Sequence, residues 1–296
     1  MTVPFGSIGA WGHLDSLAAP EARAYARRVD ELGYGALWVP ETVGREPFTL
    51  LGLLADATRG MWLGTSVVNI WGRDAQAAHM GAMTLAEATG GRFALGLGVS
   101  HPHLAEKVRG HRFERPLSRM REYLAAYRAA RYRGPGAAEL EQPPLLVAAL
   151  RERMTDLAAT DSDGAFPYLV TPARVAWMRN RLDSAVVDRR PMLAVTLPVA
   201  LADRPDRRDA ARAYLAPYLR TPAYRASWEL QGFGDDDWDA PGSDRLVDAM
   251  VSVGDAVQAA ARIAELRQAG ADHVALIPLA PDGTTEHLPT LEELAI

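Results

Sequence analysis

Eight short segments of almost unbroken apolar character recur along this 296-residue chain, and stretches with a helical pattern separate them. Because a strand that is covered on both faces is apolar throughout, such segments are typical of buried parallel strands. The predicted strands are 3–9, 35–40, 61–69, 92–98, 144–150, 164–170, 191–199 and 272–279. Eight βα units in succession indicate the α/β class and a (β/α)8 TIM barrel.

The predicted helices between these strands have recognisable ends. The helix over 20–33 opens with Pro20, which suits a first turn, and stops at Gly33. Asp74 and Asp255 each precede a helical stretch, and an aspartate there can accept a hydrogen bond from a free amide of the first turn. We therefore expect both aspartates to be N-caps.

The gap between the seventh and eighth predicted strands is too long for one helix. Residues 204–246 carry further helical patterns and a polar, glycine-rich turn. We interpret this segment as a helical insertion that packs on the barrel. On this interpretation residues 1–296 form a single domain.

Charge and composition exclude several classes of function. The chain has 32 basic and 37 acidic residues, and the two signs are interspersed, so no basic stripe is available for a nucleic-acid backbone. It has no cysteine, which excludes disulfides, thiolate zinc sites and cysteine nucleophiles. No apolar run approaches the roughly 20 residues of a membrane helix, and the N-terminal residues lack the pattern of a signal peptide. We expect a cytoplasmic protein with neither a nucleic acid nor a membrane as its partner.

The active site of such a barrel lies at the carboxyl ends of the strands, and this rule selects the candidate site residues. The selected positions are rich in tryptophan and small residues and poor in paired carboxylates, which is typical of a cleft for a flat ring. The candidates for the substrate pocket are Trp11, Trp71, His101 and Tyr168. Trp38 is expected in the core, and Gly98 is expected where the backbone approaches a cofactor or a helix closely.

His13 and Glu41 are the candidate acid–base residues because they follow the first and second predicted strands. The alternatives are a hydrogen-bonded loop histidine and a carboxylate at the start of a helix. His101 and His103 have the spacing of a metal pair, but no carboxylate pattern completes it. We therefore expect no metal site.

Five segments together resemble the luciferase-like monooxygenase superfamily, in order and in spacing. They look most like its branch that uses the deazaflavin coenzyme F420, and they extend over nearly the whole chain. The segments are LWVPE at 37–41, LGTSVVNIWGRDAQAAHMGAMTL at 63–85, GGRFALGLGVSH at 90–101, LLVAALRERMTDLAA at 145–159 and AGADHVALIPL at 269–279.

This resemblance implies a cofactor site on the third and fifth predicted strands. Ser66-Val67 would be a cis peptide bond that supports the central ring, and Asn69 would face the cofactor from the same strand. The amides of Ala149, Leu150 and Arg151 would hold a phosphate at a helix N-terminus. The side chains of Arg151 and Arg153 would add direct contacts to that phosphate.

The resemblance also implies the activity. We expect a coenzyme F420-dependent reductase that transfers a hydride between the deazaflavin C5 and a small organic substrate, and we expect a homodimer. One dehydrogenase branch has a histidine and a glutamate where this chain has Thr42 and Val99, so sugar-phosphate dehydrogenation is not expected.

Three other functions stay open at this point. The first is an FMN-dependent monooxygenase that uses reduced flavin and oxygen. The second is a non-catalytic flavin- or deazaflavin-binding protein. A phosphate-binding lyase or isomerase is the least favoured, because the one lysine of the chain, Lys107, lies in a predicted loop.

Overall fold

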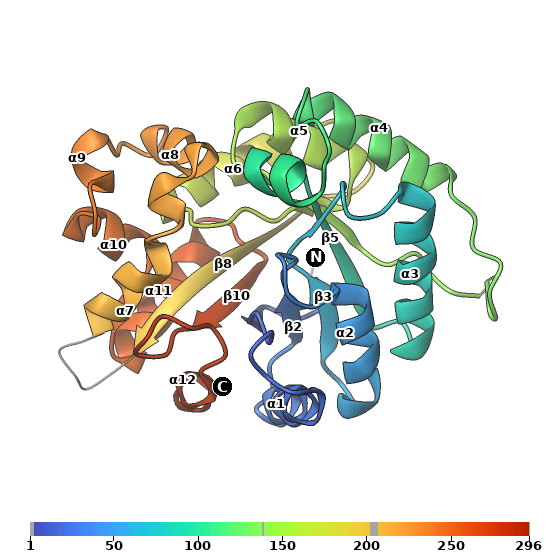
Figure 1. The fold of residues 1–296 in the computed structure, drawn as a ribbon, viewed down its shortest axis with the longest axis horizontal. Helices are drawn as coiled ribbons and strands as arrows, with labels where there is room; N and C mark the ends of the chain where they lie inside the picture. Colours follow the sequence, from blue (N-terminus) through green and yellow to red (C-terminus); the bar gives the residue numbers. More distant parts are fainter. Residues whose placement is uncertain (1–2, 138, 202–206, 296) are drawn as a thin grey trace.

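Eight parallel ribs close into a barrel in the computed structural model, which describes residues 3–137, 139–201 and 207–295 (Figure 1). β10 pairs with β1 on one side and with β8 on the other, which closes the sheet. The ribs are β1 (Ile8–Trp11), β2 (Ala36–Val39), β3 (Trp62–Thr65) continued by β4 (Val68–Asn69), β5 (Phe93–Gly98), β6 (Leu145–Val147), β7 (Gly164–Ala165), β8 (Met192–Leu201) and β10 (His273–Pro278). The predicted (β/α)8 TIM barrel is confirmed.

Helices cover the outside of this barrel (Figure 1). They are α1 (Ala19–Glu31), α2 (Pro47–Leu54), α3 (Ala75–Ala88), α4 (Pro116–Ala129), α5 (Glu152–Asp161), α6 (Pro172–Asp183), α11 (Ala256–Gln268) and α12 (Leu288–Glu293). The carboxylates of Asp74 and Asp255 each accept a hydrogen bond of 2.8 Å, from the amides of Ala77 and Gln258, so both predicted N-caps are confirmed. In the part of the chain that the structure describes, no helix is both long and apolar enough to cross a bilayer.

In its described part, the segment between β8 and β9 (Ser252–Gly254) carries four α-helices. They are α7 (Arg207–Leu215), α8 (Pro222–Glu229), α9 (Asp235–Trp238) and α10 (Asp244–Met250). In Figure 1 they lie together on the left, beyond β8. The first residues of the predicted insertion, 204–206, lie outside the described residues.

Several predicted strand boundaries are wrong. β1 occupies Ile8–Trp11 instead of residues 3–9, because the apolar Phe5 is buried outside the strand, edge-on to Trp38 with 5.2 Å between ring centroids. The rib predicted over 61–69 is interrupted after Thr65. A further strand, β9 (Ser252–Gly254), pairs with the end of β8 and was not predicted, because three residues are too few for a recognisable apolar run.

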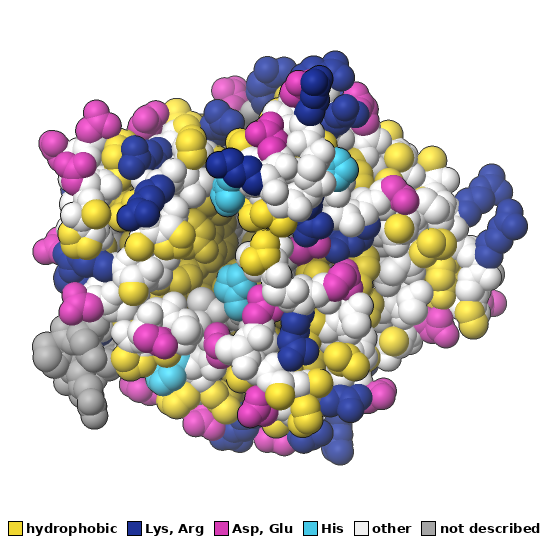
Figure 2. Space-filling model, viewed as in Figure 1, with side chains coloured by type: hydrophobic (Ala, Val, Ile, Leu, Met, Phe, Trp, Pro, Cys, Tyr) yellow, Lys and Arg dark blue, Asp and Glu magenta, His cyan; other side chains and the backbone are white. Residues whose placement is uncertain are grey.

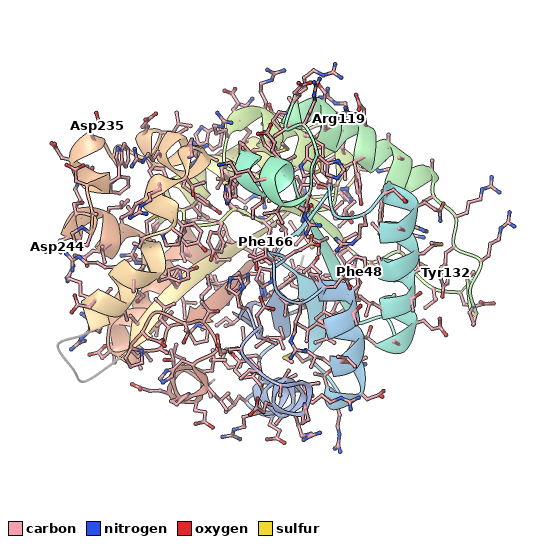
Figure 3. All side chains as sticks on the ribbon, in the orientation of Figure 1. Phe48, Arg119, Tyr132, Phe166, Asp235 and Asp244 are labelled. Atoms are coloured by element: carbon pink, nitrogen blue, oxygen red, sulfur yellow. The ribbon has the colours of Figure 1, made fainter. Side chains whose placement is uncertain are left out.

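Trp38 fills the interior of the barrel, which confirms its predicted place in the core. Its ring is fully buried and lies edge-on to Phe166, near the barrel centre (Figure 3), with 4.9 Å between centroids. The indole N–H donates to Nε2 of the fully buried His273 over 2.9 Å. The other ring nitrogen of His273 lies 2.8 Å from the carbonyl of Gly6. Nε2 therefore accepts and Nδ1–H donates, which requires the neutral ring.

Thermal stability should fall on acidification through His273. Burial lowers the pKa of His273 to about 4, from the ordinary value of 6.5. The neutral ring stabilises the fold fully above the unfolded pKa, and this contribution is lost as the pH falls toward the folded pKa, because the unfolded chain binds the proton first. His273→Gln keeps a donor and an acceptor without titrating. Its Tm should fall less than that of the wild type between about pH 7 and about pH 5. An equal fall in both proteins would contradict this assignment.

Gly96 allows β5 to pass close to the end of β3. A methyl group at Gly96 would collide with the backbone carbonyl of Thr65, which cannot turn aside as a side chain can. We expect Gly96→Ala to lower the free energy of unfolding by about 1–3 kcal/mol. The control is Gly52→Ala in α2, where the nearest atom would be 4.0 Å away, and we expect it to raise stability by about 0.5–1 kcal/mol. Urea titration measures both, and equal stability of the two variants would refute the steric argument.

Candidate functional site

A cavity of about 490 Å³ opens at the carboxyl ends of the strands. Ligand pockets are typically about 300–1,000 Å³, so the size is ordinary for a small-molecule site. Figure 2 shows this face hollowed, with yellow apolar side chains inside and histidines at the edge of the hollow. The predicted residues that line the cavity are Trp11, His13, Glu41, Ser66, Val67, Asn69, Gly98, His101, Ala149, Leu150, Arg151 and Tyr168.

The third rib is interrupted at the cavity, between β3 and β4. The Ser66-Val67 peptide bond at this break is cis, as predicted. The amide of Ser66 donates to the carbonyl of Val39 over 2.8 Å, which holds the break against β2. The carbonyl of Ser66 accepts a hydrogen bond of 3.1 Å from the indole of Trp11, at the end of β1. Trp11 is buried, so this bond is shielded from solvent. β1 and β2 therefore set the orientation of the Ser66-Val67 peptide.

Gly98 provides room for the side chain that follows this break. A methyl group at Gly98 would lie 2.6 Å from Cγ2 of Val67 and 3.4 Å from Cβ of Ala148. The chain at Gly98 thus lies close to these two side chains, and the close approach to a cofactor predicted for Gly98 stays a prediction.

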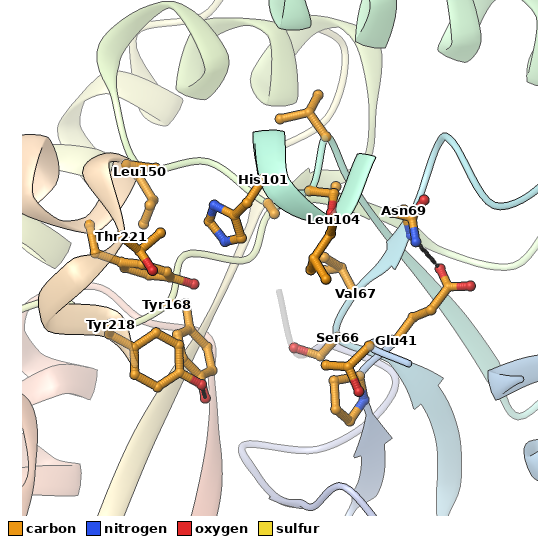
Figure 4. A pocket seen from close by; sticks show the side chains of 18 of the residues that line it. Glu41, Ser66, Val67, Asn69, His101, Leu104, Leu150, Tyr168, Tyr218 and Thr221 are labelled. Atoms are coloured by element: carbon orange, nitrogen blue, oxygen red, sulfur yellow. Dashed lines mark hydrogen bonds between the residues drawn. The ribbon is translucent and has the colours of Figure 1, made fainter. Parts of the chain in front are cut away.

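Glu41 is the centre of a charge cluster at the edge of the cavity. Its side chain is 5% exposed and pairs with Arg73 at 2.6 Å and with Arg109 at 3.2 Å. The same carboxylate accepts two hydrogen bonds of 2.7 Å from Asn69, one from the backbone amide and one from the side chain (Figure 4). With its oxygens bound in this way, Glu41 positions Asn69 and the two arginines. The acid–base role predicted for it stays a prediction.

Asn69 lines the cavity, but protein groups take up both ends of its side-chain amide. The nitrogen donates to Glu41, and the oxygen accepts from the amide of Trp71 over 3.0 Å. These two hydrogen bonds therefore hold the side chain of Asn69 in one orientation at the cavity.

Two predicted residues lie outside the lining of the cavity. The ring of Trp71 packs beside His111 and Phe113, with centroids 5.6 Å and 6.1 Å away, and its indole donates to the carbonyl of Val99. Trp71 therefore supports the loop after β5 and is not among the lining residues, and the pocket role predicted for it stays a prediction. The side chain of Arg153, in the first turn of α5, is exposed and is not among the lining residues.

The loop between β6 and α5 presents a helix N-terminus at the cavity. The amides of Met154 and Thr155 make the first hydrogen bonds of the helix, both to the carbonyl of Arg151, and the backbone before them forms the cavity wall. Arg174 on α6 donates to the carbonyl of Leu150 over 2.6 Å and so fixes the loop. A helix N-terminus of this kind favours an anion, because its free amides and its dipole point outward.

His13 lies at the mouth of the cavity with 32% of its side chain exposed. Its ring is edge-on to Trp11, and Nδ1 is 3.8 Å from the carboxylate of Asp15. Burial lowers the pKa of His13, and the neighbouring Asp15 partly opposes that shift. His13 is therefore a group with access to both the cavity and the solvent.

Sequence reasoning missed the tyrosines that form the far wall of the cavity. Tyr218 and Tyr224 come from the segment between β8 and β10 and meet Tyr168 from the loop after β7 (Figure 4). Tyr214 and Tyr218 lie four residues apart, as do Tyr224 and Trp228, and this helical spacing was the available signal.

Loss of the Glu41 carboxylate should destabilise the protein strongly. Glu41→Ala leaves Arg73 and Arg109, 11% and 24% exposed, without this partner, and we expect a loss on the order of 3 kcal/mol. The matched control is Glu122→Ala, whose pair with Arg119 is about half exposed on both sides, with an expected change within about 0.5 kcal/mol. Equal unfolding midpoints for the two variants in urea would contradict the central role of Glu41.

Comparison with known proteins bears on the family and on the fold. The model of the luciferase-like monooxygenase family matches residues 5–273. A protein of Mycobacterium tuberculosis named "Putative coenzyme F420-dependent oxidoreductase" is 30% identical over 207 residues, which cover 58% of this chain and 57% of that relative. A 5,10-methylenetetrahydromethanopterin reductase of Archaeoglobus fulgidus is 25% identical over 303 residues, covering 88% and 91% of the two chains.

Solved structures share the fold at low identity. An F420-dependent secondary alcohol dehydrogenase in complex with an F420-acetone adduct aligns with a TM-score of 0.77 at 14% identity, over 98% of both chains. The oxygenating constituent of 3,6-diketocamphane monooxygenase from Pseudomonas putida, in complex with FMN, aligns with a TM-score of 0.72 at 15% identity, over 98% of this chain and 97% of that one. The barrel, the match over residues 5–273 and the relatives agree, and the chain belongs to the luciferase-like monooxygenase family.

Proposed function

We propose that this chain is a coenzyme F420-dependent oxidoreductase that transfers a hydride between the deazaflavin C5 and a small organic substrate, in the direction of substrate reduction. The observation that carries the proposal is the arrangement of the cavity, in which the broken third rib and the N-terminus of α5 line one space. The names of the relatives from Mycobacterium tuberculosis and Archaeoglobus fulgidus support the oxidoreductase class.

The residues around the cavity fit such a cofactor. A flat ring has a support in Ser66, Val67 and Gly98, where the backbone of two ribs is close, and the Ser66 carbonyl is already bound by Trp11. A phosphate has the amides of the loop from Ala149 to Arg151, with the exposed Arg153 nearby in sequence. When bound, the deazaflavin would supply a two-electron hydride donor or acceptor.

The chain's own groups would orient the reactants and exchange a proton. Asn69 is held by Glu41 and contributes a fixed edge of the site. His13 reaches both cavity and solvent, and we propose it as the group that exchanges a proton with the substrate. Thr42 and Val99 also line the cavity, so the histidine–glutamate pair of the sugar-phosphate dehydrogenases is replaced by uncharged residues.

An FMN-dependent monooxygenase is the second candidate. The alignment with the FMN complex of 3,6-diketocamphane monooxygenase favours it, because FMN and the deazaflavin share a tricyclic ring and a phosphate. Oxygen consumption with reduced FMN would support this candidate. A non-catalytic binding protein would instead bind a cofactor and show no turnover with any substrate.

Cofactor titration followed by fluorescence tests the proposal. We expect F420 to bind and FMN to bind more weakly; tight binding of FMN with no response to F420 would reject the assignment. Trp11→Phe removes the hydrogen bond to Ser66 and should weaken F420 binding about tenfold, since a buried hydrogen bond contributes about 1–2 kcal/mol. Trp38→Phe also removes a buried indole bond, but Trp38 does not line the cavity, and the change should leave the affinity unchanged in the folded protein.

We also propose a homodimer, from the family resemblance, and the cytoplasmic location that the sequence analysis predicts. Leu53 on α2 and Met80 on α3 are 38% and 45% exposed on neighbouring helices, which supports an apolar contact there. Light scattering after size-exclusion chromatography measures the mass in solution, and a monomer would overturn the first proposal.

A further inference from the structure

The far side of the cavity is a continuous aromatic surface. We call Tyr168, Tyr218 and Tyr224 the aromatic wall. Their ring centroids are 5.0 to 6.1 Å apart, and Trp11 extends the surface with its centroid 5.8 Å from that of Tyr168. Rings at this spacing pack on one another, so they form a wall and do not enclose a separate box. A wall of this kind suits a flat apolar ligand.

The hydroxyl groups of this wall are largely engaged within the protein. The Tyr168 hydroxyl bonds to the hydroxyls of Tyr214 and Tyr218, the latter at 3.2 Å. The neighbouring Thr221 donates its hydroxyl to the carbonyl of Pro217 over 3.0 Å. Burial raises the pKa of the wall tyrosines, so all three are neutral phenols. The wall therefore presents mainly ring carbon atoms to the cavity, together with the hydroxyl of Tyr224, which has no hydrogen-bond partner among the described residues.

Among the lining residues that the structure describes, none provides a free carboxylate. The carboxylate of Glu41 is bound by Arg73 and Arg109. The guanidinium of Arg151, at the N-terminus of α5, also borders the cavity, but its side chain is exposed, so solvent screens its charge. A charged ligand placed against the aromatic wall would lose hydration without gaining a partner of opposite charge, which is costly.

One polar group stands beside the wall and lacks a partner. The imidazole of His101 points into the cavity (Figure 4), and its Nδ1 is buried without a hydrogen bond to any described residue. The ring is 5.4 Å from that of Tyr224 and stacks at 6.1 Å with that of His103. Burial lowers the pKa of His101 to about 4, so the ring is neutral and has one donor and one acceptor nitrogen. An unsatisfied buried nitrogen is costly and indicates that a ligand or water completes the site.

We propose that the substrate is an uncharged molecule with a flat apolar ring body and one hydrogen-bonding group, as in a cyclic or aryl ketone or imine, and that His101 binds that group while the body lies on the aromatic wall. This inference rests on the proposed function, since it assigns the substrate class of the same cavity. It makes His101 and Tyr218 residues that determine specificity.

Four naphthalene probes with one ring system test this proposal: 2-acetylnaphthalene, 2-ethylnaphthalene, 2-naphthoate and 2-naphthyltrimethylammonium. Each is titrated by calorimetry into the purified full chain, with and without saturating F420. We expect the ketone to bind about tenfold tighter than either ion, because neither ion finds a counter-charge at the wall. We expect it to bind several-fold tighter than the ethyl compound, because only the ketone bonds to His101.

Variants separate the two contacts. His101→Phe should abolish the preference for the ketone over the ethyl compound and keep the affinity of the latter. Tyr218→Ala should weaken both neutral probes about tenfold, whereas Tyr218→Phe, which keeps the ring, should not. The controls are His111→Phe and Tyr132→Ala, which lie outside the cavity lining and should change no affinity. Circular dichroism and Tm verify that each variant is folded.

The contrary outcomes are specific. Tightest binding of 2-naphthoate would assign the cavity to anions and overturn the proposal. Tightest binding of the ammonium probe would mean that the rings bind a cation, and would also overturn it. Absence of binding by every probe together with tight F420 binding would overturn the substrate class and leave the proposed function intact. Absence of F420 binding would reject the proposed function, whatever the probes do.

Discussion

The hydrogen bond from Trp11 to the Ser66 carbonyl is the contact on which the site depends. It joins the end of β1 to the break in the third rib, and both residues are buried. Gly96 and Gly98 on β5 leave the space that the break occupies. The indole of Trp11 and the two glycines therefore determine where the backbone on this side of the cavity lies.

A second constraint is electrostatic. Glu41 joins three segments that are far apart in sequence: the break in the third rib through Asn69, the start of α3 through Arg73, and the loop after β5 through Arg109. Each of these charged groups is at least three-quarters buried, and together they compensate one another. The cluster keeps charge at the edge of the cavity and leaves the interior to apolar and neutral polar groups.

Local signals predicted much of the fold and part of the site. The apolar runs predicted the eight ribs. Asp74 and Asp255 predicted the starts of two helices, because an N-cap depends on neighbouring residues alone. The sequence could not fix the orientation of Trp71, because a tryptophan at a strand end can face either side of the rib, and its packing on His111 and Phe113 is a tertiary contact. Tyr218 and Tyr224 of the aromatic wall were missed because they lie far from the strand ends along the chain, whereas Tyr168, near a strand end, was among the candidates.

By itself the sequence determined the barrel, its family and the position of the broken rib, because periodicity and short motifs are local properties of a chain. The tertiary structure decided which candidate side chains share one cavity. It also decided which of them already bind other groups of the protein. Glu41 became a positioning group when two arginines met its carboxylate, and Tyr218 became a cavity residue when the segment after β8 folded over the barrel mouth. Such contacts join distant parts of the chain, and no local pattern encodes them.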